Sequence, residues 1–153
     1  MYVTKEAAEM KKKIQLLFAG LAVMLLPNLS CAAEITLDEQ FVIGGDLRNG
    51  TKIAKGRIFC PEAHTEFRIW VNSQAQKKGT GHYILLGKHS ENNRMNIRLE
   101  GDGWRVSSIE AKNSLTKFWS GNIATFDVVV DGDQKVPSDE YFISVSGYCI
   151  SDR

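Results

Sequence analysis

The sequence is poor in the residues and motifs that catalysis usually requires. Among its 153 residues are three histidines, and no two of them stand at the spacing of a helical or finger-type pair of metal ligands. There is no G-x-S-x-G nucleophile elbow and no glycine loop suited to phosphate. We therefore predict no catalytic residue, no bound metal and no cofactor, and we do not expect an enzyme.

An excess of charge is also missing, since 19 lysines and arginines oppose 18 aspartates and glutamates. Proteins that bind nucleic acid or an anionic membrane usually carry a basic surplus. We accordingly expect no nucleic acid among the partners.

One apolar run stands out near the N-terminus, from Ile14 to Leu26, directly after three lysines at positions 11–13. Pro27 interrupts it short of the roughly 18 to 20 residues that a membrane-spanning helix needs. A positive segment followed by a short apolar one is typical of a secretory signal peptide. The pattern predicts export without a transmembrane anchor.

The end of the predicted signal is marked by small residues. Ser30 and Ala32 occupy the two positions that signal peptidase reads, so we predict cleavage after Ala32. Residues 1–32 would then be the signal peptide, and residues 33–153 a single exported domain. Because the three lysines directly follow Met10, we place the true start of translation at that methionine.

Cysteine is scarce, with three in the chain. Cys31 leaves with the signal peptide, and a lipoprotein signal is disfavoured because Asn28 stands where such signals have leucine. Cys60 and Cys149 remain in an oxidising compartment, where thiols usually pair. A disulfide between them would stabilise the fold by about 4–5 kcal/mol in the loop-entropy model. The alternative is two buried free thiols.

The exported part has no apolar repeat of helical period. Its apolar residues alternate with polar ones in short runs separated by turn residues, which is the pattern of a β-sandwich. Strands are predicted at residues 35–43, 51–60, 67–71, 82–86, 94–99, 104–109, 123–130 and 141–149.

Two parts of this pattern need an interpretation. We interpret residues 94–109 as an inserted β-hairpin turning at Gly101-Asp102-Gly103. Residues 107–121 have the weakest pattern and are predicted as a loop with irregular pieces. The remaining strands match the first six strands of an immunoglobulin-like sandwich, and the fold class is all-β.

A seventh strand is missing from this count, because only four residues follow Cys149 in the sequence. A sandwich without its last (G) strand exposes an apolar groove and two unpaired edges, and exposed edges favour aggregation. Donor-strand complementation would fill the groove with an extended segment of another protein. In the alternative, residues 35–43 swing across and close their own sheet. The groove is predicted to be lined by Ile35, Leu37, Phe41, Ile143 and Val145.

Several segments resemble one known family. They are Gly56–Trp70, Gly101–Trp104, Phe126–Val128 with Asp131-Gly132, and Glu140-Tyr141 leading to Gly147 and Cys149. These segments are similar to the AfaD/DraD family of fimbrial tip proteins and invasins, and within it most closely to the minor tip subunits of aggregative adherence fimbriae. The sequence departs from the family's pattern around residues 41–46 and 107–121.

The resemblance implies an incomplete immunoglobulin-like domain that is carried by a periplasmic chaperone to an outer-membrane usher. It also implies a location at the fimbrium tip on the cell surface, with a strand donated by the major fimbrial subunit. A host cell-surface receptor, for which integrins are a candidate, is a further implied partner. The family's disulfide corresponds to Cys60 and Cys149. The alternative function is a free-standing secreted immunoglobulin-like binding module.

One aromatic residue is a candidate for surface contact. Trp70 falls on the polar face of its strand, between Arg68 and Asn72, so it could meet a partner directly. The alternative is that it packs beneath the predicted 94–109 hairpin.

Overall fold

The structure is a computed structural model that describes residues 33–73, 81–107 and 113–151. The predicted signal peptide and the cleavage after Ala32 lie outside these residues and stay predictions. Nowhere in the described part does a helix reach the length and hydrophobicity that crossing a bilayer requires.

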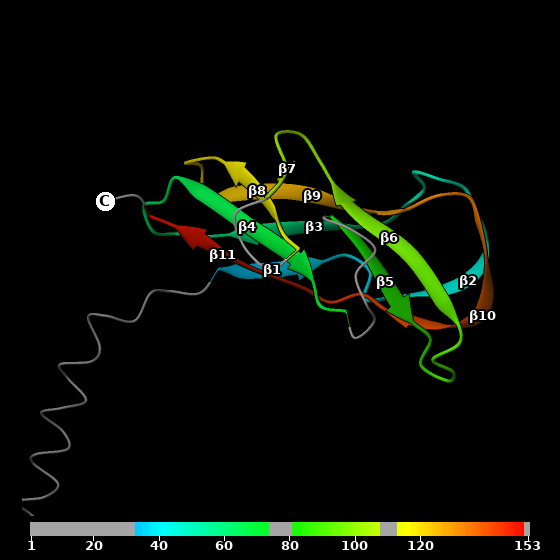
Figure 1. Cartoon of the computed structure of the whole chain (residues 1–153). Coiled ribbons are helices and arrows are strands. Elements are labelled where there is room, and N and C mark those ends of the chain that lie inside the picture. The colour runs from blue at the N-terminus through cyan, green and yellow to red at the C-terminus, as the bar shows by residue number, and fades with distance from the viewer. Residues whose placement is uncertain (1–32, 74–80, 108–112, 152–153) are drawn as a thin grey trace, which may run out of the picture. The chain divides into compact units, whose positions relative to one another are not determined.

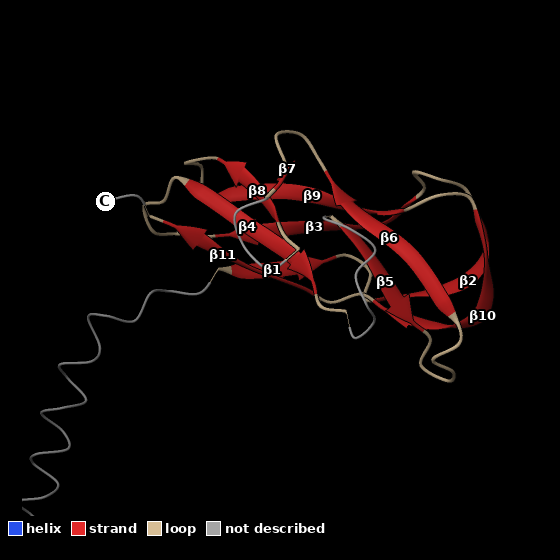
Figure 2. Cartoon of the chain, viewed as in Figure 1, coloured by secondary structure: helices blue, strands red, loops and turns tan. Residues whose placement is uncertain are grey.

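Two antiparallel sheets and a separate strand pair make up the described fold (Figures 1 and 2). The first sheet has the order β1 (Glu34–Leu37), β3 (Lys52–Phe59), β9 (Ile123–Val130), β6 (Arg94–Glu100) and β5 (His82–Leu86). The second has the order β11 (Val145–Ile150), β4 (Glu66–Val71), β8 (Leu115–Phe118) and β7 (Arg105–Val106). The pair consists of β2 (Phe41–Leu47) and β10 (Gln134–Phe142), which lie at one end of the sandwich in Figure 1.

Alternation along the strands builds the core between the sheets. In β4, Phe67, Ile69 and Val71 are buried, whereas the intervening side chains are partly exposed. β6 repeats the pattern, with Met95 and Ile97 fully buried. Because successive side chains of a strand point to opposite faces, each sheet contributes one apolar face to a shared interior. The all-β, immunoglobulin-like class predicted from the sequence is confirmed.

The predicted hairpin at residues 94–109 is wrong. β6 pairs with β5 and β9 in the first sheet, whereas β7 pairs with β8 in the second. The turn after β6 therefore carries the chain from one sheet to the other. Trp104 follows the turn, donates from Nε1 to the Thr125 carbonyl at 2.8 Å and packs edge-on against Phe126. The predicted loop at residues 107–121 contains β8.

The first predicted strand is divided in two. β1 ends at Leu37, although Asp38 still bonds to β3: its amide donates to the Lys55 carbonyl at 3.0 Å, and its carboxylate accepts from the Lys55 amide at 2.6 Å. The strand breaks at residues 38–40. Beyond this break the chain joins β10 as β2, and Val42 rather than its neighbours turns inward. β2 pairs with β10, and among the described residues neither β1 nor β2 pairs with β11, so the alternative in which residues 35–43 close their own sheet stays a prediction. The last predicted strand likewise comprises β10, which begins at Gln134, and β11.

Candidate functional site

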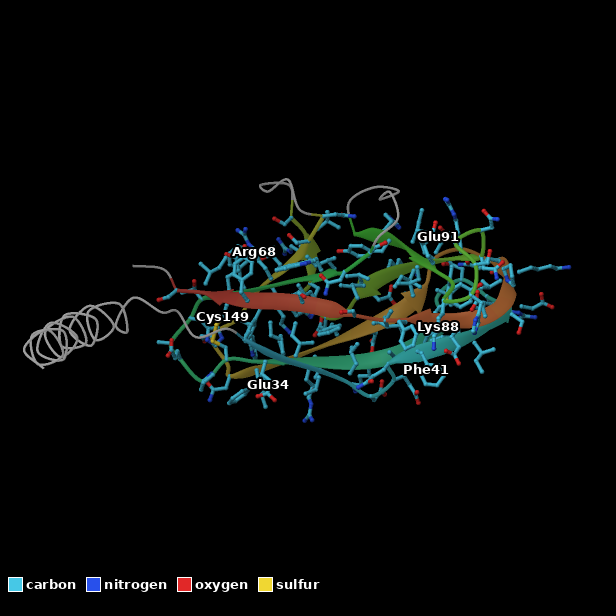
Figure 3. The ribbon with its side chains drawn as sticks, turned by 90° about the horizontal axis from the view of Figure 1, so that it is seen from below. Glu34, Phe41, Arg68, Lys88, Glu91 and Cys149 are labelled. Atoms are coloured by element: carbon cyan, nitrogen blue, oxygen red, sulfur yellow. A yellow bond between two sulfur atoms is a disulfide. The ribbon has the colours of Figure 1, made fainter. Side chains whose placement is uncertain are left out.

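Two strand edges of the sandwich lack a neighbour on the same side of the molecule. β1 pairs only with β3, and β11 only with β4, among the strands that the structure describes. β1 and β11 lie side by side in both views (Figures 1 and 3). We call this region the β1–β11 seam and define it by the inward-facing residues Ile35, Leu37, Val145, Gly147 and Cys149.

The β11 edge offers unpaired backbone groups to the seam. The Ser144 carbonyl accepts from the Asn72 amide, and the Ile150 carbonyl accepts from the Thr65 amide, both at 2.8 Å. Since N–H and C=O groups alternate between the two sides of a strand, the backbone groups of residues 145, 147 and 149 point away from β4. The seam therefore presents both donors and acceptors along one line.

Apolar side chains at the seam are incompletely covered. Ile35, Leu37 and Val145 are each half-buried, whereas Ile58 and Phe67 on the adjoining strands are fully buried. Burial of apolar surface stabilises by about 25 cal/mol per Å², so partly exposed side chains leave stabilisation unused. The seam side chains are therefore less well covered than Ile58 and Phe67.

Gly147 determines how closely β1 approaches β11. A Cβ atom at this position would lie 2.5 Å from the Arg68 carbonyl oxygen and 2.9 Å from the Ile35 Cδ1 atom. Only glycine leaves room for the Ile35 side chain to rest on β11. Gly147 was not among the site residues predicted from the sequence, although its position on the inward face, with no side chain, was a readable signal.

The seam has defined ends. At one end the Ile143 amide donates to the Gln40 carbonyl at 2.9 Å, and beyond this bond β2 covers β10. At the other end a disulfide joins Cys60, at the end of β3, to Cys149 on β11, with the Cα atoms 6.5 Å apart. The bond ties the two sheets together, and Cys60 is fully buried.

The residues predicted for the groove divide into three groups. Ile35, Leu37 and Val145 lie at the seam, and Ile143 is buried at its closed end. Phe41 does not belong to the seam: it is 47% exposed, and its ring packs against Phe142 at 6.2 Å between centroids. The break at residues 38–40 reverses which residues of the segment face inward, so alternation carried across it gave the wrong side.

Trp70 is neither fully exposed nor covered by a hairpin. It lies half-buried on the face of β4 that points away from the core, and its ring meets the Tyr148 ring edge-on at 5.7 Å. Its role in surface contact stays a prediction.

A second residue that the sequence analysis missed is Asp139, which is buried. Its carboxylate accepts hydrogen bonds from the Asn93 side chain and from the backbone amides of His89, Ser90 and Glu140. Burial by itself raises the pKa of Asp139, but these hydrogen bonds outweigh it and lower the pKa to about 2. The charged carboxylate thereby anchors the loop between β5 and β6, and no sequence motif announces this.

One group of side chains has the composition of a metal site within the described residues, namely Cys60, His64 and Cys149, whose ligand atoms lie within 4.8 Å of one another. The two sulfur atoms are bonded to each other. The His64 ring nitrogens contact the carbonyl oxygens of Glu62 at 2.6 Å and Gly121 at 2.8 Å. With its sulfurs and ring nitrogens already engaged, this group acts as a structural cluster at the end of the sandwich.

Comparison with known proteins places the chain in a family. The family model described as "Enterobacteria AfaD invasin protein" matches residues 43–147. Protein AggB of Escherichia coli is 38% identical over 94% of this chain and 99% of its own length, and Protein AfaD of Escherichia coli is 32% identical over 91% and 94%.

A solved structure agrees with this assignment. The Escherichia coli Hda pilus minor tip subunit, HdaB, superposes with a TM-score of 0.73 at 32% identity, covering 80% of this chain and 85% of that one. The sandwich, its seam and its extensive likeness to these relatives lead to one conclusion: the chain belongs to the AfaD invasin family.

Proposed function

We propose that this chain is a minor tip subunit of a chaperone/usher-assembled fimbria, displayed at the bacterial cell surface, where it contributes to host-cell adhesion or invasion. The observation that carries the proposal is that, in the described part of the chain, β1 pairs only with β3 and β11 only with β4, although β1 and β11 are neighbours. The relative HdaB is itself described as a minor tip subunit of a pilus. A binding or structural role, rather than catalysis, follows for this chain.

A donated strand fits the seam by its backbone. Neighbouring strands lie about 4.8 Å apart, so a strand seated between β1 and β11 would bond to the groups of residues 145, 147 and 149. Its alternate apolar side chains would cover Leu37 and Val145. Because Ile35 rests on Gly147 in the free chain, the incoming strand must displace that contact, and Ile35 serves as a temporary cover.

The partners follow from this role. A periplasmic chaperone would first supply a strand, an outer-membrane usher would exchange it, and the major fimbrial subunit would donate the final one. Export requires the signal peptide, so we propose that residues 1–32 are removed before assembly. The adhesive partner would be a host cell-surface receptor, with integrins as one candidate.

A periplasmic expression experiment tests the proposal. Residues 33–153 should accumulate as soluble monomer when the chaperone is co-expressed, and should be degraded, aggregated or domain-swapped without it. A fusion that appends a donor strand through a flexible linker is the matched control and should be monomeric alone. Recovery of a stable monomer with no added strand would favour the free-standing binding module instead.

A further inference from the structure

A second feature of the domain lies outside the seam. A cavity of about 760 Å³ opens between the end of β4, the end of β5 and the junction of β10 with β11. This volume falls in the range of small-molecule binding sites. Among the residues that line it are Trp70, Asn72, Lys88, Glu91, Phe142 and Ser144.

Aromatic side chains form the apolar part of the wall. Phe142 is 51% exposed, and the Lys88 ammonium lies 5.6 Å from its ring centroid. Trp70 contributes a second aromatic ring from the neighbouring sheet. Two aromatic rings in one open cavity can pack against the C–H face of a sugar ring.

Polar groups are interspersed with the rings. Asn72 uses its Nδ2 group to donate to Ser144 Oγ at 3.0 Å and Ser146 Oγ at 2.7 Å, which directs its amide along the cavity wall. Glu91 is exposed on the loop between β5 and β6, which also carries Lys88. Figure 3 shows both of these side chains at the end of the molecule remote from Cys149.

We propose that this cavity binds a neutral saccharide. Aromatic rings would pack on the apolar face of the sugar, while Asn72 Oδ1 and the Glu91 carboxylate would accept hydrogen bonds from its hydroxyl groups. Lys88 and Glu91 bring opposite charges, and Lys88 is also paired with Glu140 at 3.5 Å. The cavity therefore has no surplus charge that would select an acidic ligand.

An extended peptide fits the cavity less well, because several backbone groups of its described lining residues are already hydrogen-bonded. Ser73 Oγ donates to the Ile84 carbonyl, and the Gly87 amide donates to the Asn93 carbonyl. The Ser144 carbonyl accepts from Asn72. Strand addition needs a row of free N–H and C=O groups, as at the seam, and these bonds interrupt such a row among the described residues.

Asp139 positions the loop that carries the polar wall. Its carboxylate accepts hydrogen bonds from the backbone amides of His89 and Ser90, which lie between Lys88 and Glu91 in the sequence. It also accepts one from the side chain of Asn93, two residues after Glu91. Gly87 passes so close to this carboxylate that a Cβ atom there would clash with it. The cavity is thus built on a fixed loop.

Saturation-transfer NMR and isothermal titration would test the proposal with the chain held in complex with its chaperone or a donor strand. The probes are galactose, glucose, mannose, N-acetylglucosamine and N-acetylgalactosamine, with sialic acid as the anionic comparison. At least one neutral sugar should bind saturably. Phe142→Ser and Glu91→Ala should each raise its Kd at least about tenfold, whereas Phe118→Ser, at a side chain that is 70% exposed on β8, should leave it unchanged.

Three results would overturn the proposal: no saturable binding by any neutral sugar, binding unaffected by both cavity variants, or tighter binding of sialic acid than of every neutral probe. If an extended peptide displaces the sugar and binds the wild-type protein specifically, the cavity is a peptide-binding site instead. Sugar binding by the cavity does not depend on the tip-subunit role, since loss of donor-strand capture and loss of sugar binding are measured separately.

Discussion

Replacing Val145 with aspartate tests the seam most directly. Val145 lies on the inward face of β11 and is half-buried, so in the free chain a carboxylate at this position keeps part of its hydration. A donor strand seated beside β11 would cover the side chain completely. The substitution should therefore weaken capture of the donor strand more than it weakens folding of the free chain.

The magnitude follows from burial and charge. Full burial of a valine side chain is worth about 1.5–3 kcal/mol, so covering the part that is still exposed contributes at most about 1 kcal/mol. An unpaired buried charge costs about 3 kcal/mol or more. Capture should weaken by about 4 kcal/mol, a roughly thousandfold rise in Kd. Val145→Ala should lose the first contribution alone, or about fivefold.

The assay follows release of the chain from its chaperone by a fluorescent peptide taken from the N-terminal extension of the major subunit. Ser144→Asp is the matched control, because Ser144 precedes Val145, is exposed, and a carboxylate there can still accept the hydrogen bond from Asn72 Nδ2. The control should capture the peptide almost as well as the wild type. Equal losses at Ser144 and Val145 would refute the assignment of the inward face.

Three further changes have definite outcomes. Replacing Cys60 and Cys149 together by serine should lower the free energy of unfolding by about 4–5 kcal/mol in urea titrations, because the bond spans 89 residues of sequence, and a loss below about 1 kcal/mol would contradict this. In Asp139→Asn, stability should depend less on pH in acid than it does in the wild type. The pKa of the Asp139 carboxyl falls from 3.8 to about 2 on folding, so its contribution to stability is complete above about pH 4 and disappears as the pH falls through about 2. If the melting temperatures of the wild type and of Asp139→Asn fall equally with pH over that range, the expected contribution of Asp139 is contradicted. Gly147→Val should lower both the melting temperature and donor capture, since its Cβ would meet the Arg68 carbonyl at 2.5 Å, and an unchanged melting temperature would mean that β11 can shift freely.

Much of the fold could be predicted because local alternation reports burial directly. The inward faces of β4 and β6 follow strict period two, and both were predicted with the correct face. Pairing is a different matter. β6 and β7 are joined by a glycine-rich turn that is typical of a hairpin, yet Trp104 packs against Phe126 and sends the chain to the other sheet. That choice depends on a tertiary contact, which no short-range pattern contains.

The candidate site shows the same division. Ile35 and Val145 could be identified because they share a face with neighbours in a continuous strand. Phe41 could not be placed correctly, because the strand breaks at residues 38–40 and the inward face is reversed beyond the break. The role of Asp139 could not be predicted for a related reason: its hydrogen-bond partners on the loop between β5 and β6 are about 50 residues away in sequence.

The seam and the cavity make use of opposite faces of one short segment. Phe142 and Ser144 line the cavity, whereas Ile143 and Val145 turn toward the interior and the seam. A shift of β11 by one residue would exchange these two sets and destroy both surfaces. The bond from Ile143 to the Gln40 carbonyl fixes the register at one end, and the disulfide at Cys149 fixes it at the other. An edge strand with no partner on one side can slip in register. The disulfide therefore also holds the register of β11, a role that is not measured by its contribution to the free energy of unfolding.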